Sequence, residues 1–346
     1  MSVRAGSCVV AIVVAATLNA CNAADDVTPS GTPASTARHH TSSHGPGHPN
    51  DSSDRVRKPR TTVTIVGDIM LGRGVAAVSQ ASDPAAPLRS MRPLLHRADV
   101  TVGNLESTLS DDGVARQGDD SFAADPRVLP AMARLGFDAL SLANNHTGDF
   151  GPGALLDTVA AFGGSGVSSF GAGRGLQAAS RPVVLERKGV RFGFLGFNTI
   201  GETPRAAHGR PGALSVRMPP RTGPLDRQDL TRVLGAVRRL SRHVDVVVVM
   251  PHWGTQYTHR VLPVQRLVGR LLVRAGADLV VGGHPHWVQE VEHFHGAAIA
   301  YSLGNFAGYH ALGYTGVVGI TGILKVTLRK DGSYVSGTLV PTHMVA

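Results

Sequence analysis

Short runs of β-branched and apolar residues recur along the chain from Thr61 onward, and each run ends abruptly in glycine or polar residues. A continuous apolar run of this length is typical of a strand buried on both faces, as in a parallel sheet. The runs that we predict to be strands are residues 62–66, 100–102, 139–142, 192–197, 244–250, 279–281 and 298–303.

Stretches with helical periodicity precede several of these strands. They are residues 93–97, 128–135, 153–162, 228–240 and 262–275. In the last stretch, Leu267, Leu271, Leu272 and Ala275 are spaced as a buried stripe along one helix face. Continuous apolar strands that alternate with helices predict an α/β layered fold.

The C-terminal part of the chain has a different pattern. Residues 322–329 and 334–341 are extended runs on either side of Asp331-Gly332. An Asp-Gly pair between two such runs is a strong signal for a β-hairpin. We therefore predict a closing antiparallel hairpin, either at a sheet edge or in the second sheet of a sandwich.

Residues 1–24 have the features of a signal peptide, with Arg4 ahead of an apolar run at residues 8–18 that is short for a membrane span. Leu18-Asn19-Ala20-Cys21 resembles a bacterial lipoprotein cleavage site. Cys8 and Cys21 are the two cysteines of the chain. We predict lipidation of Cys21 and an extracytoplasmic protein anchored to the cell membrane. The alternative is a secreted protein that is cleaved after Ala23.

Residues 25–60 are rich in Pro, Ser, Thr and His and hold few large apolar side chains, so we predict a disordered linker. Residues 61–346 then form one domain. The formal net charge is +9, but the basic residues are scattered rather than interleaved with aromatic residues, which disfavours nucleic-acid binding. An anionic polymer or a membrane surface is the partner that this charge favours.

Polar side chains follow nearly every predicted strand, and in open α/β folds ligands bind at the carboxyl ends of strands. The candidate metal ligands at these positions are Asp68, Asn104, Glu106, Asn145, His252, His284 and His286. Asn104 and the Asn-His pair at 145–146 are also residues that occur in turns. Their repetition after successive strands favours a functional site.

Asp, Asn, Glu and His without cysteine form an oxygen and nitrogen ligand set, which suits Mn²⁺, Zn²⁺ or Fe, as one ion or two. Such ions lower the pKa of a bound water molecule. On an extended segment, the spacing of His284 and His286 would direct both side chains to one face. His146 is a candidate catalytic residue, either as a general acid or as a hydrogen-bond donor to the transition state. Neutral imidazole is the form that binds metal ions. We therefore expect metal affinity to fall as the pH drops through about 6.5, the pKa of histidine in model peptides.

The motifs VGDIMLGR, GNLES, ANNHTGDFG, MPHWG, GGHPHWVQ and YSLGNF, in this order, resemble the CapA family of capsule and poly-γ-glutamate synthesis proteins. That family is a branch of the calcineurin-like metallophosphoesterases. The resemblance covers residue 62 to the C-terminus. It implies an α/β/β/α sandwich with mixed sheets.

The resemblance also implies roles for individual residues. Asp68 matches the first metal aspartate, Asn145 the asparagine ligand and His146 the catalytic histidine. The three remaining histidine ligands match His252, His284 and His286. Two positions depart from the superfamily pattern, because Met70 stands where a histidine is usual and Asn104 where an aspartate bridges two metals. Glu106 lies two residues after Asn104. Either Glu106 takes over part of the bridging role of the missing aspartate, or only one metal ion binds well.

Two functions are consistent with these residues. One is a metal-dependent hydrolase of a cell-envelope polymer pathway that cleaves a phosphoester or a γ-amide, with Arg73 as a candidate substrate-binding residue. Arg73 is equally consistent with a solvated surface position. The other is a non-catalytic accessory protein that binds the polymer or the subunits of its membrane synthase through a degenerate metal site.

Overall fold

The computed structural model describes residues 16–18, 60–78, 83–308 and 316–344. Cys21 and almost all of the predicted signal peptide and linker lie outside these residues. Residues 16–18 form strand β1 (Ala16–Leu18), which pairs antiparallel with the last strand of the domain. The first strand of the domain begins at Arg60, the last residue assigned to the linker from the sequence.

One of the two large sheets in the described residues combines the first half of the domain with its C-terminus. Its parallel strands are β2 (Arg60–Ile69), β3 (Val100–Leu105), β4 (Ala139–Ser141), β5 (Ser168–Phe170) and β14 (Asn305–Ala307). The antiparallel pair β15 (Ile320–Arg329) and β16 (Tyr334–His343) extends this sheet beyond β2. The hairpin predicted around Asp331-Gly332 is therefore confirmed, and it lies in the same sheet as the first strand.

The other large sheet has the order β12-β13-β11-β10-β8-β7. Its parallel strands are β8 (Val190–Asn198), β10 (Val246–His252), β11 (Leu279–Val281) and β13 (Ala297–Ala300). Its two edges are the antiparallel strands β7 (Val183–Arg187) and β12 (Val291–Phe294). A further short pair joins β6 (Ala172–Gly173) to β9 (Gly212–Ala213).

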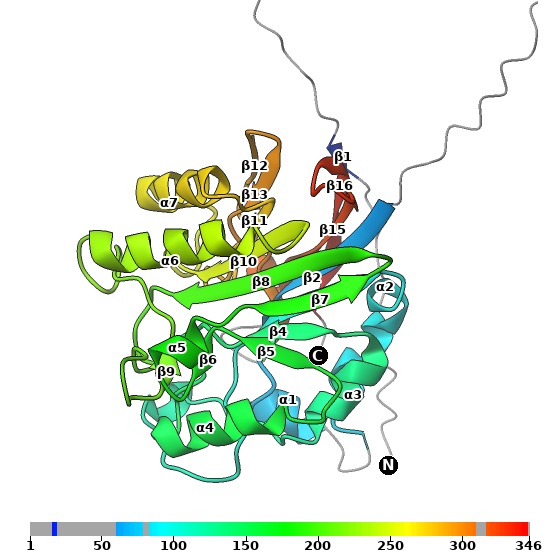
Figure 1. Cartoon of the computed structure of the whole chain (residues 1–346). Coiled ribbons are helices and arrows are strands. Elements are labelled where there is room, and N and C mark those ends of the chain that lie inside the picture. Colours follow the sequence, from blue (N-terminus) through cyan, green and yellow to red (C-terminus); the bar gives the residue numbers. More distant parts are fainter. Residues whose placement is uncertain (1–15, 19–59, 79–82, 309–315, 345–346) are drawn as a thin grey trace, which may run out of the picture.

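Helices cover the outer face of each sheet (Figure 1). The first sheet is covered by α1 (Arg73–Val78), α2 (Arg92–Leu95), α3 (Val128–Leu135) and α4 (Gly151–Ala161). The second sheet is covered by α5 (Leu176–Ala179), α6 (Arg227–Leu240) and α7 (Pro263–Arg274). The predicted α/β/β/α sandwich with mixed sheets and a C-terminal hairpin is confirmed.

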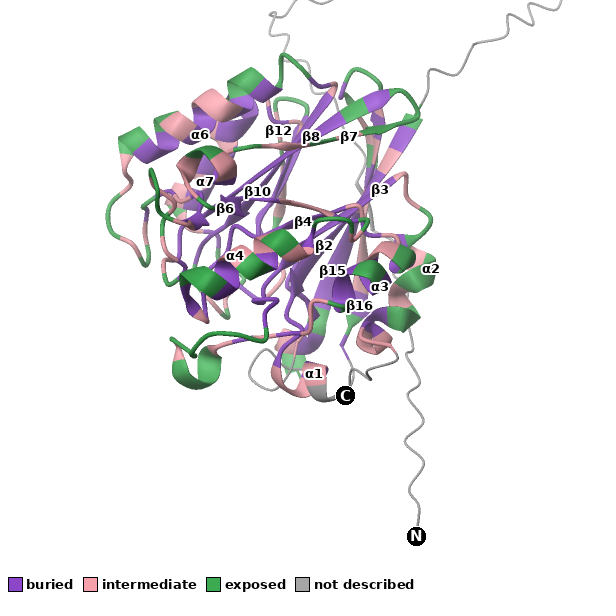
Figure 2. Cartoon of the chain, turned by 60° about the horizontal axis from the view of Figure 1, so that its bottom comes forward, coloured by how far each residue is buried: buried purple, intermediate pink, exposed green. Residues whose placement is uncertain are grey.

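Strand β10 shows why its sequence is apolar at every position. Val246 and Val248 lie in the core between the two sheets, whereas Val247 and Val249 lie in the core beneath α6 and α7. Successive side chains of a strand point to opposite faces, and here both faces are covered. Figure 2 shows the same arrangement, with buried strands inside and exposed residues on the outer sides of the helices.

The predicted apolar stripe of α7 is wrong at Leu267, whose exposed fraction is 50%. The face that packs on the sheet instead carries Val268 and Leu272, which are fully buried and four residues apart. Residues four apart lie on the same face of a helix, so the contact with the sheet selects this pair. Leu267 is displaced by one position from that face.

The carboxyl ends of β2, β3 and β4 lie at the same edge of the molecule as those of β10 and β11. Backbone bridges place Asp68 beside Asn104 and beside Asn305, and His252 beside Gly283. Gly283 permits this approach, because a Cβ atom there would lie 2.4 Å from Oδ1 of Asp68. In the described part of the chain, no helix is long and apolar enough to cross a membrane.

Candidate metal centre

Every candidate metal ligand and the candidate catalytic histidine lie in one buried cluster between the strand ends. Each of these residues has an exposed fraction of 5% or less. They are Asp68, Asn104, Glu106, Asn145, His146, His252, His284 and His286. Segments far apart in the sequence are thus brought together at the edge where parallel strands end.

Asp68, the penultimate residue of β2, is held by donors on both oxygens. Nδ2 of Asn104 donates to Oδ1 at 2.8 Å, and the backbone N–H of His284 donates to Oδ2 at 2.9 Å. The same Oδ2 lies 3.5 Å from Nδ1 of His286. These contacts hold one carboxylate oxygen between the two sheets.

Asn104 directs its amide nitrogen at Asp68, while its Oδ1 accepts a hydrogen bond from Nδ2 of Asn144 at 3.0 Å. The oxygen of Asn104 would reach a metal ion only after the amide group turned over, because an amide ligates through oxygen. In the described arrangement Asn104 orients Asp68, and its role as a ligand stays a prediction.

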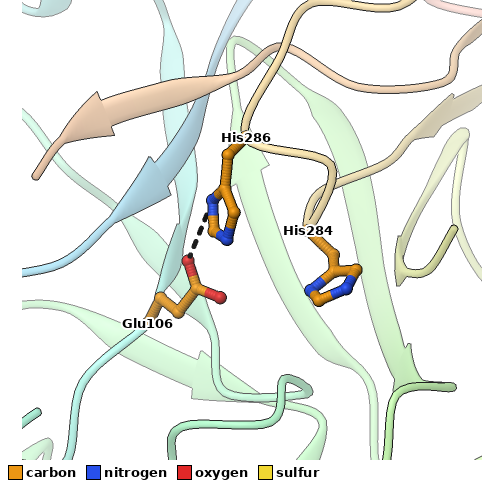
Figure 3. A group of neighbouring side chains, drawn as sticks. All are labelled: Glu106, His284 and His286. Atoms are coloured by element: carbon orange, nitrogen blue, oxygen red, sulfur yellow. Dashed lines mark ion pairs between the residues drawn. The ribbon is translucent and has the colours of Figure 1, made fainter. Parts of the chain in front are cut away.

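Among the described residues, Glu106 is the carboxylate common to two groups of side chains that could hold an ion. One group is Glu106 with His284 and His286, drawn in Figure 3, and the other is Glu106 with Asp68 and His252. Oε1 of Glu106 lies 3.2 Å from Nε2 of His252, and Oε2 lies 4.0 Å from Nδ1 of His286. Both oxygens are buried without a hydrogen bond. A buried carboxylate is costly unless it is paired or coordinates a metal, so its position favours a bound metal ion beside it.

His252 ends β10 and faces the first sheet. Its Nε2 lies 2.8 Å from Oδ1 of Asn145, so the asparagine oxygen and the imidazole nitrogen converge on one point. Asn145 follows β4 in the loop that also carries His146. The two residues therefore add an amide oxygen and an imidazole to the group around Asp68 and Glu106.

The prediction that His284 and His286 lie on an extended segment is wrong. Both have left-handed backbone conformations, with φ of 93° and 58°, in a turn after β11. The two rings nevertheless lie 5.7 Å apart, both beside Glu106. Such conformations cost on the order of 1–3 kcal/mol for residues other than glycine and persist where surrounding contacts enforce them, often at functional sites.

Burial dominates the electrostatics of the cluster. It raises the pKa of Asp68 to about 7, with a further contribution from the charge of Glu106, and it raises the pKa of Glu106 as well. Burial also lowers the pKa of His252 to about 4 and that of His284 well below its ordinary value. His252 and His284 are consequently neutral near pH 7, which is the form that ligates metal ions.

His146 is oriented by a second acidic residue. Its Nδ1 donates to Oδ2 of Asp149 at 2.9 Å, which leaves Nε2 directed at Oε1 of Glu106, 4.0 Å away. Burial lowers the pKa of His146, but the hydrogen bond to Asp149 and the charge of Glu106 outweigh it and raise the pKa above its ordinary value. A protonated Nε2 near neutral pH suits the donation of a proton.

Arg73 lies at the edge of this site, at the start of α1. Its guanidinium group is 5.0 Å from the ring centre of Phe122, and the ring of Phe122 is 4.3 Å from that of His146. The side chain of Arg73 has an exposed fraction of 29%. It is therefore one aromatic ring away from the candidate catalytic residue.

Three residues with evident roles in the site were not assigned roles from the sequence. Oδ1 of Asn144 accepts hydrogen bonds from the backbone N–H groups of His146 and Thr147, each at 3.0 Å. Asp149 orients His146 through its hydrogen bond to Nδ1. Oδ1 of Asn305 accepts a hydrogen bond from Nδ1 of His286 at 2.8 Å. The signal that could have identified Asp149 is its position three residues after His146. Metal-binding and catalytic histidines commonly donate their other ring nitrogen to an acid or amide.

The residues of the cluster fit a divalent metal centre. Glu106 has two buried oxygens without hydrogen bonds, and Nδ1 of His284 is likewise buried without one. Both residues belong to a group of oxygen and nitrogen atoms that lie within 4.8 Å of one another. Unpaired buried polar atoms are uncommon, and a shared ion is the simplest way to satisfy them. Met70 is outside this cluster, in the core between the first sheet and its helices.

The pKa values of the cluster predict how metal affinity depends on pH. A metal ion must displace the proton of Asp68, whose pKa is about 7, whereas His252, with a pKa of about 4, is already neutral. We expect affinity for Mn²⁺ to fall as pH drops below about 7, by about tenfold per pH unit for each proton displaced. Calorimetric titration between pH 8 and pH 5 measures this affinity. An affinity that stays the same over that pH range would contradict the prediction.

The two sheets packed face to face, with helices on both outer faces and a buried cluster at the strand ends, define the class of protein: it is an α/β/β/α sandwich. One solved structure with the same fold is a hypothetical protein from Thermus thermophilus. It is 16% identical, with a TM-score of 0.50, over 82% of this chain and 100% of that one. At this identity the likeness concerns the fold alone.

Residues 62–309 match the family model described as bacterial capsule synthesis protein PGA_cap, and the chain belongs to this family. It is 30% identical to the PGA biosynthesis protein CapA of Bacillus subtilis over 71% of this chain and 62% of the relative. It is 31% identical to the capsule biosynthesis protein CapA of Bacillus anthracis over 71% of this chain and 59% of the relative. A probable polyglutamine synthesis accessory protein of Mycobacterium tuberculosis is 31% identical over 70% of this chain and 73% of its own length. The match therefore spans about three fifths of the two Bacillus proteins.

Proposed function

We propose that this chain is a metal-dependent hydrolase that acts in the synthesis or export of a capsule or poly-γ-glutamate at the cell envelope. The observation that carries the proposal is the position of Glu106, buried without hydrogen bonds between two groups of metal-ligand side chains. Mn²⁺, Zn²⁺ and Fe are the ions that this ligand set favours.

In this mechanism some side chains bind the metal ions and another donates a proton. Asp68, Glu106, Asn145 and the three histidines would hold one or two ions, with Glu106 as the shared carboxylate. A bound ion supplies a water molecule of lowered pKa and positive charge against a developing oxyanion. Asp149 keeps the Nδ1 proton of His146 in place, so Nε2 can give its proton to the leaving group.

The class of substrate follows from the relatives and from charge. The names of the two Bacillus relatives refer to capsule or PGA biosynthesis. The present chain carries a net charge of +9, which favours an anionic substrate. An ion-activated water molecule is suited to a phosphoester or to a γ-amide of such a polymer.

A non-catalytic accessory function is the second candidate. Met70 lies in the core where the superfamily has a histidine, and Asn104 orients Asp68 where the superfamily has a bridging aspartate. These two residues weaken a two-metal centre. The relative from Mycobacterium tuberculosis is itself named a probable accessory protein. In that case the chain would bind the polymer or its membrane synthase without cleaving a bond.

Turnover by the purified chain separates the two functions. Wild-type protein loaded with Mn²⁺ or Zn²⁺ is expected to hydrolyse a generic phosphodiester or a γ-glutamyl oligomer, and a chelator is expected to stop the reaction. Elemental analysis of the same sample gives the number of ions. Bound metal without turnover of either substrate would favour the accessory function.

We further propose that the chain is exported and anchored to the membrane through a lipid on Cys21. The support is the cleavage motif at residues 18–21 and the composition of the segment that follows it. Cys21→Ala is expected to move the protein from the membrane fraction to the soluble fraction, with the unchanged distribution of Cys8→Ala as the control. A wild-type protein that is soluble, with its N-terminus after Ala23, would contradict the lipid anchor.

A further inference from the structure

The end of the sandwich opposite the metal cluster is formed by the first residues of the parallel strands. Strand β2 runs from Arg60 at that end to Asp68, its penultimate residue, in the cluster. Eight residues of extended chain span roughly 26 Å. The opposite end is therefore a separate surface, about one strand length from the metal ligands.

Both sheets contribute to this surface. Nζ of Lys188, in the turn between β7 and β8, lies 2.7 Å from Oδ1 of Asp99, which directly precedes β3. A Cβ atom on Gly332, in the turn between β15 and β16, would lie 2.8 Å from Oδ1 of Asp278, which directly precedes β11. Each sheet thus has a turn that contacts the start of a strand in the other sheet.

The C-terminal ends of α6 and α7 reach the same surface. Strands β10 and β11 begin shortly after these helices end. A Cβ atom on Gly276, after α7, would lie 2.8 Å from Oγ of Ser241, after α6. The ends of the two helices therefore lie side by side, next to the first residues of the second sheet.

Basic side chains that are exposed or partly exposed gather on these segments. They come from the start of β2, the ends of α6 and α7, and the end of β15 with its turn. None of them forms an ion pair with a carboxylate in the part of the chain that the structure describes. They are Arg60, Arg239, Arg242, Arg274, Arg329 and Lys330, and we call them the basic edge.

The carboxylates of this surface are mostly used inside the fold. The aspartate that precedes each of four strands accepts a backbone N–H near the start of the neighbouring strand, at 2.7–2.9 Å. These aspartates are Asp99, Asp138, Asp245 and Asp278. Glu186 and Asp331 are exposed acidic residues of the same surface, and Asp331 accepts hydrogen bonds from Ser333. Positive charge is therefore in excess on this surface.

Two arginines of the basic edge face each other. Arg60 and Arg329 are direct partners on the antiparallel strands β2 and β15, and like charges that face each other across a sheet destabilise it. The guanidinium group of Arg329 donates to Oγ of Ser333 at 3.2 Å and to the carbonyl of Tyr334 at 3.4 Å, which are uncharged acceptors. Negative groups from outside the chain would relieve the repulsion between the two arginines.

The chain also enters the domain at this surface. Arg60 is the last residue of the predicted linker and the first of β2. Arg55, Arg57 and Lys58 precede it closely in the sequence, so basic residues continue from the linker into the basic edge. A cluster of basic residues beside a membrane anchor is typical of segments that bind anionic lipids.

We propose that the basic edge binds the anionic headgroups of a lipid bilayer and directs the metal cluster away from the membrane. Its side chains spread over the ends of two sheets and two helices, which suits an extended charged surface. Each basic residue near such a surface strengthens binding by about fivefold. A lipid on Cys21 would hold the chain at the membrane without fixing this orientation, and the inference does not require the chain to be a hydrolase.

The test is co-sedimentation of the full chain carrying Cys21→Ala, which lacks the proposed lipid site, with vesicles. Phosphatidylglycerol vesicles should bind this parent chain at an ionic strength of about 0.1 M, and phosphatidylcholine vesicles should bind it far more weakly. Binding should be lost at about 1 M salt, where the Debye length is about 3 Å. Arg242→Glu with Lys330→Glu should weaken binding to phosphatidylglycerol at least about 25-fold. A milder pair, Arg239→Gln with Arg274→Gln, should weaken it in the same direction.

The matched control is Arg174→Glu with Arg181→Glu, which changes the net charge equally. These exposed arginines flank α5, on the opposite side of the molecule from the start of β2 (Figure 1). The control should bind phosphatidylglycerol vesicles as the parent chain does, and melting curves should show that the variants are folded. Equal weakening by the control and the edge variants would overturn the proposal. Equal binding of the parent chain to the two lipids would overturn it as well.

Two further ligands separate a bilayer from other anions. Calorimetry of the same chains measures their affinity for a short γ-linked glutamate oligomer and for inorganic phosphate. The edge variants should bind each ligand as the control does. Edge variants that lost affinity for either ligand but kept vesicle binding would assign the basic edge to a polymer or a phosphate group, and the proposal would then be wrong.

Discussion

Replacing Glu106 by glutamine is expected to abolish tight metal binding while leaving the metal-free fold at least as stable as the wild type. Glu106 is shared by both groups of candidate ligands, and neither of its oxygens has a hydrogen bond. The loss of affinity should be at least about a hundredfold, the upper end of what removal of a ligand-orienting group costs.

The metal-free protein should respond in the opposite direction. Burial raises the pKa of Glu106, so its charged form opposes folding above that pKa and Glu106→Gln removes this cost at pH 8. At a concentration of about 100 times Kd, an ion adds about 2.7 kcal/mol of stability, or roughly 5–10 °C in Tm, to the wild type. Glu106→Gln should show none of this increase.

Differential scanning calorimetry with and without Mn²⁺ measures both effects. Glu292→Gln is the matched control, because Glu292 is also largely buried but pairs with Arg266 and Arg270 on the second sheet, away from the cluster. It should keep the full increase in Tm on metal addition. A Glu106→Gln variant that retains the metal-dependent increase would exclude Glu106 as the shared ligand.

Replacing His146 by asparagine is expected to lower kcat by a factor of about 10²–10⁴ with metal content unchanged. The reason is its geometry: Asp149 holds Nδ1, and Nε2 is 4.0 Å from Glu106, so His146 borders the ligands as a proton donor. Elemental analysis and turnover of the same sample measure the two quantities. Loss of metal together with turnover would show that His146 is a ligand instead.

Asp149→Asn refines this test through the pH profile. The hydrogen bond to Asp149 helps to raise the pKa of His146, so its removal should lower that pKa. A general acid works only while protonated, and activity therefore declines as pH rises through its pKa. The alkaline limb of the profile should move to lower pH in Asp149→Asn. An unmoved limb would mean that the limb reports another group.

The local sequence was sufficient to predict the strands that lead into the site, an α/β layered fold and the C-terminal hairpin, whereas the α/β/β/α arrangement followed from the family resemblance and the strands β5, β7 and β12 were not predicted. The apolar runs are intrinsic signals, because a strand covered on both faces is apolar at consecutive positions, as Val246–Val249 are. The polar residues were predictable as a site because they directly follow the apolar runs, at the strand ends where ligands bind in open α/β folds. The chain then carries these residues to one edge, since parallel strands share the direction of their ends.

The tertiary structure alone decided which face of α7 is buried and what each site residue contacts. Val268 rather than Leu267 meets the sheet because the helix axis is fixed by packing, and periodicity does not specify its rotation. His284 and His286 reach the cluster through left-handed turns, which the Gly-Gly-His-Pro-His motif does not predict.

Glu106 shows the same division most clearly. From the sequence it follows only that an acidic residue stands two positions after Asn104. Its place between the Asp68–His252 group and the His284–His286 group depends on the distance between two separate sheets. That distance is set by the apolar side chains packed between the sheets, and contacts between segments so far apart in the chain leave no local pattern.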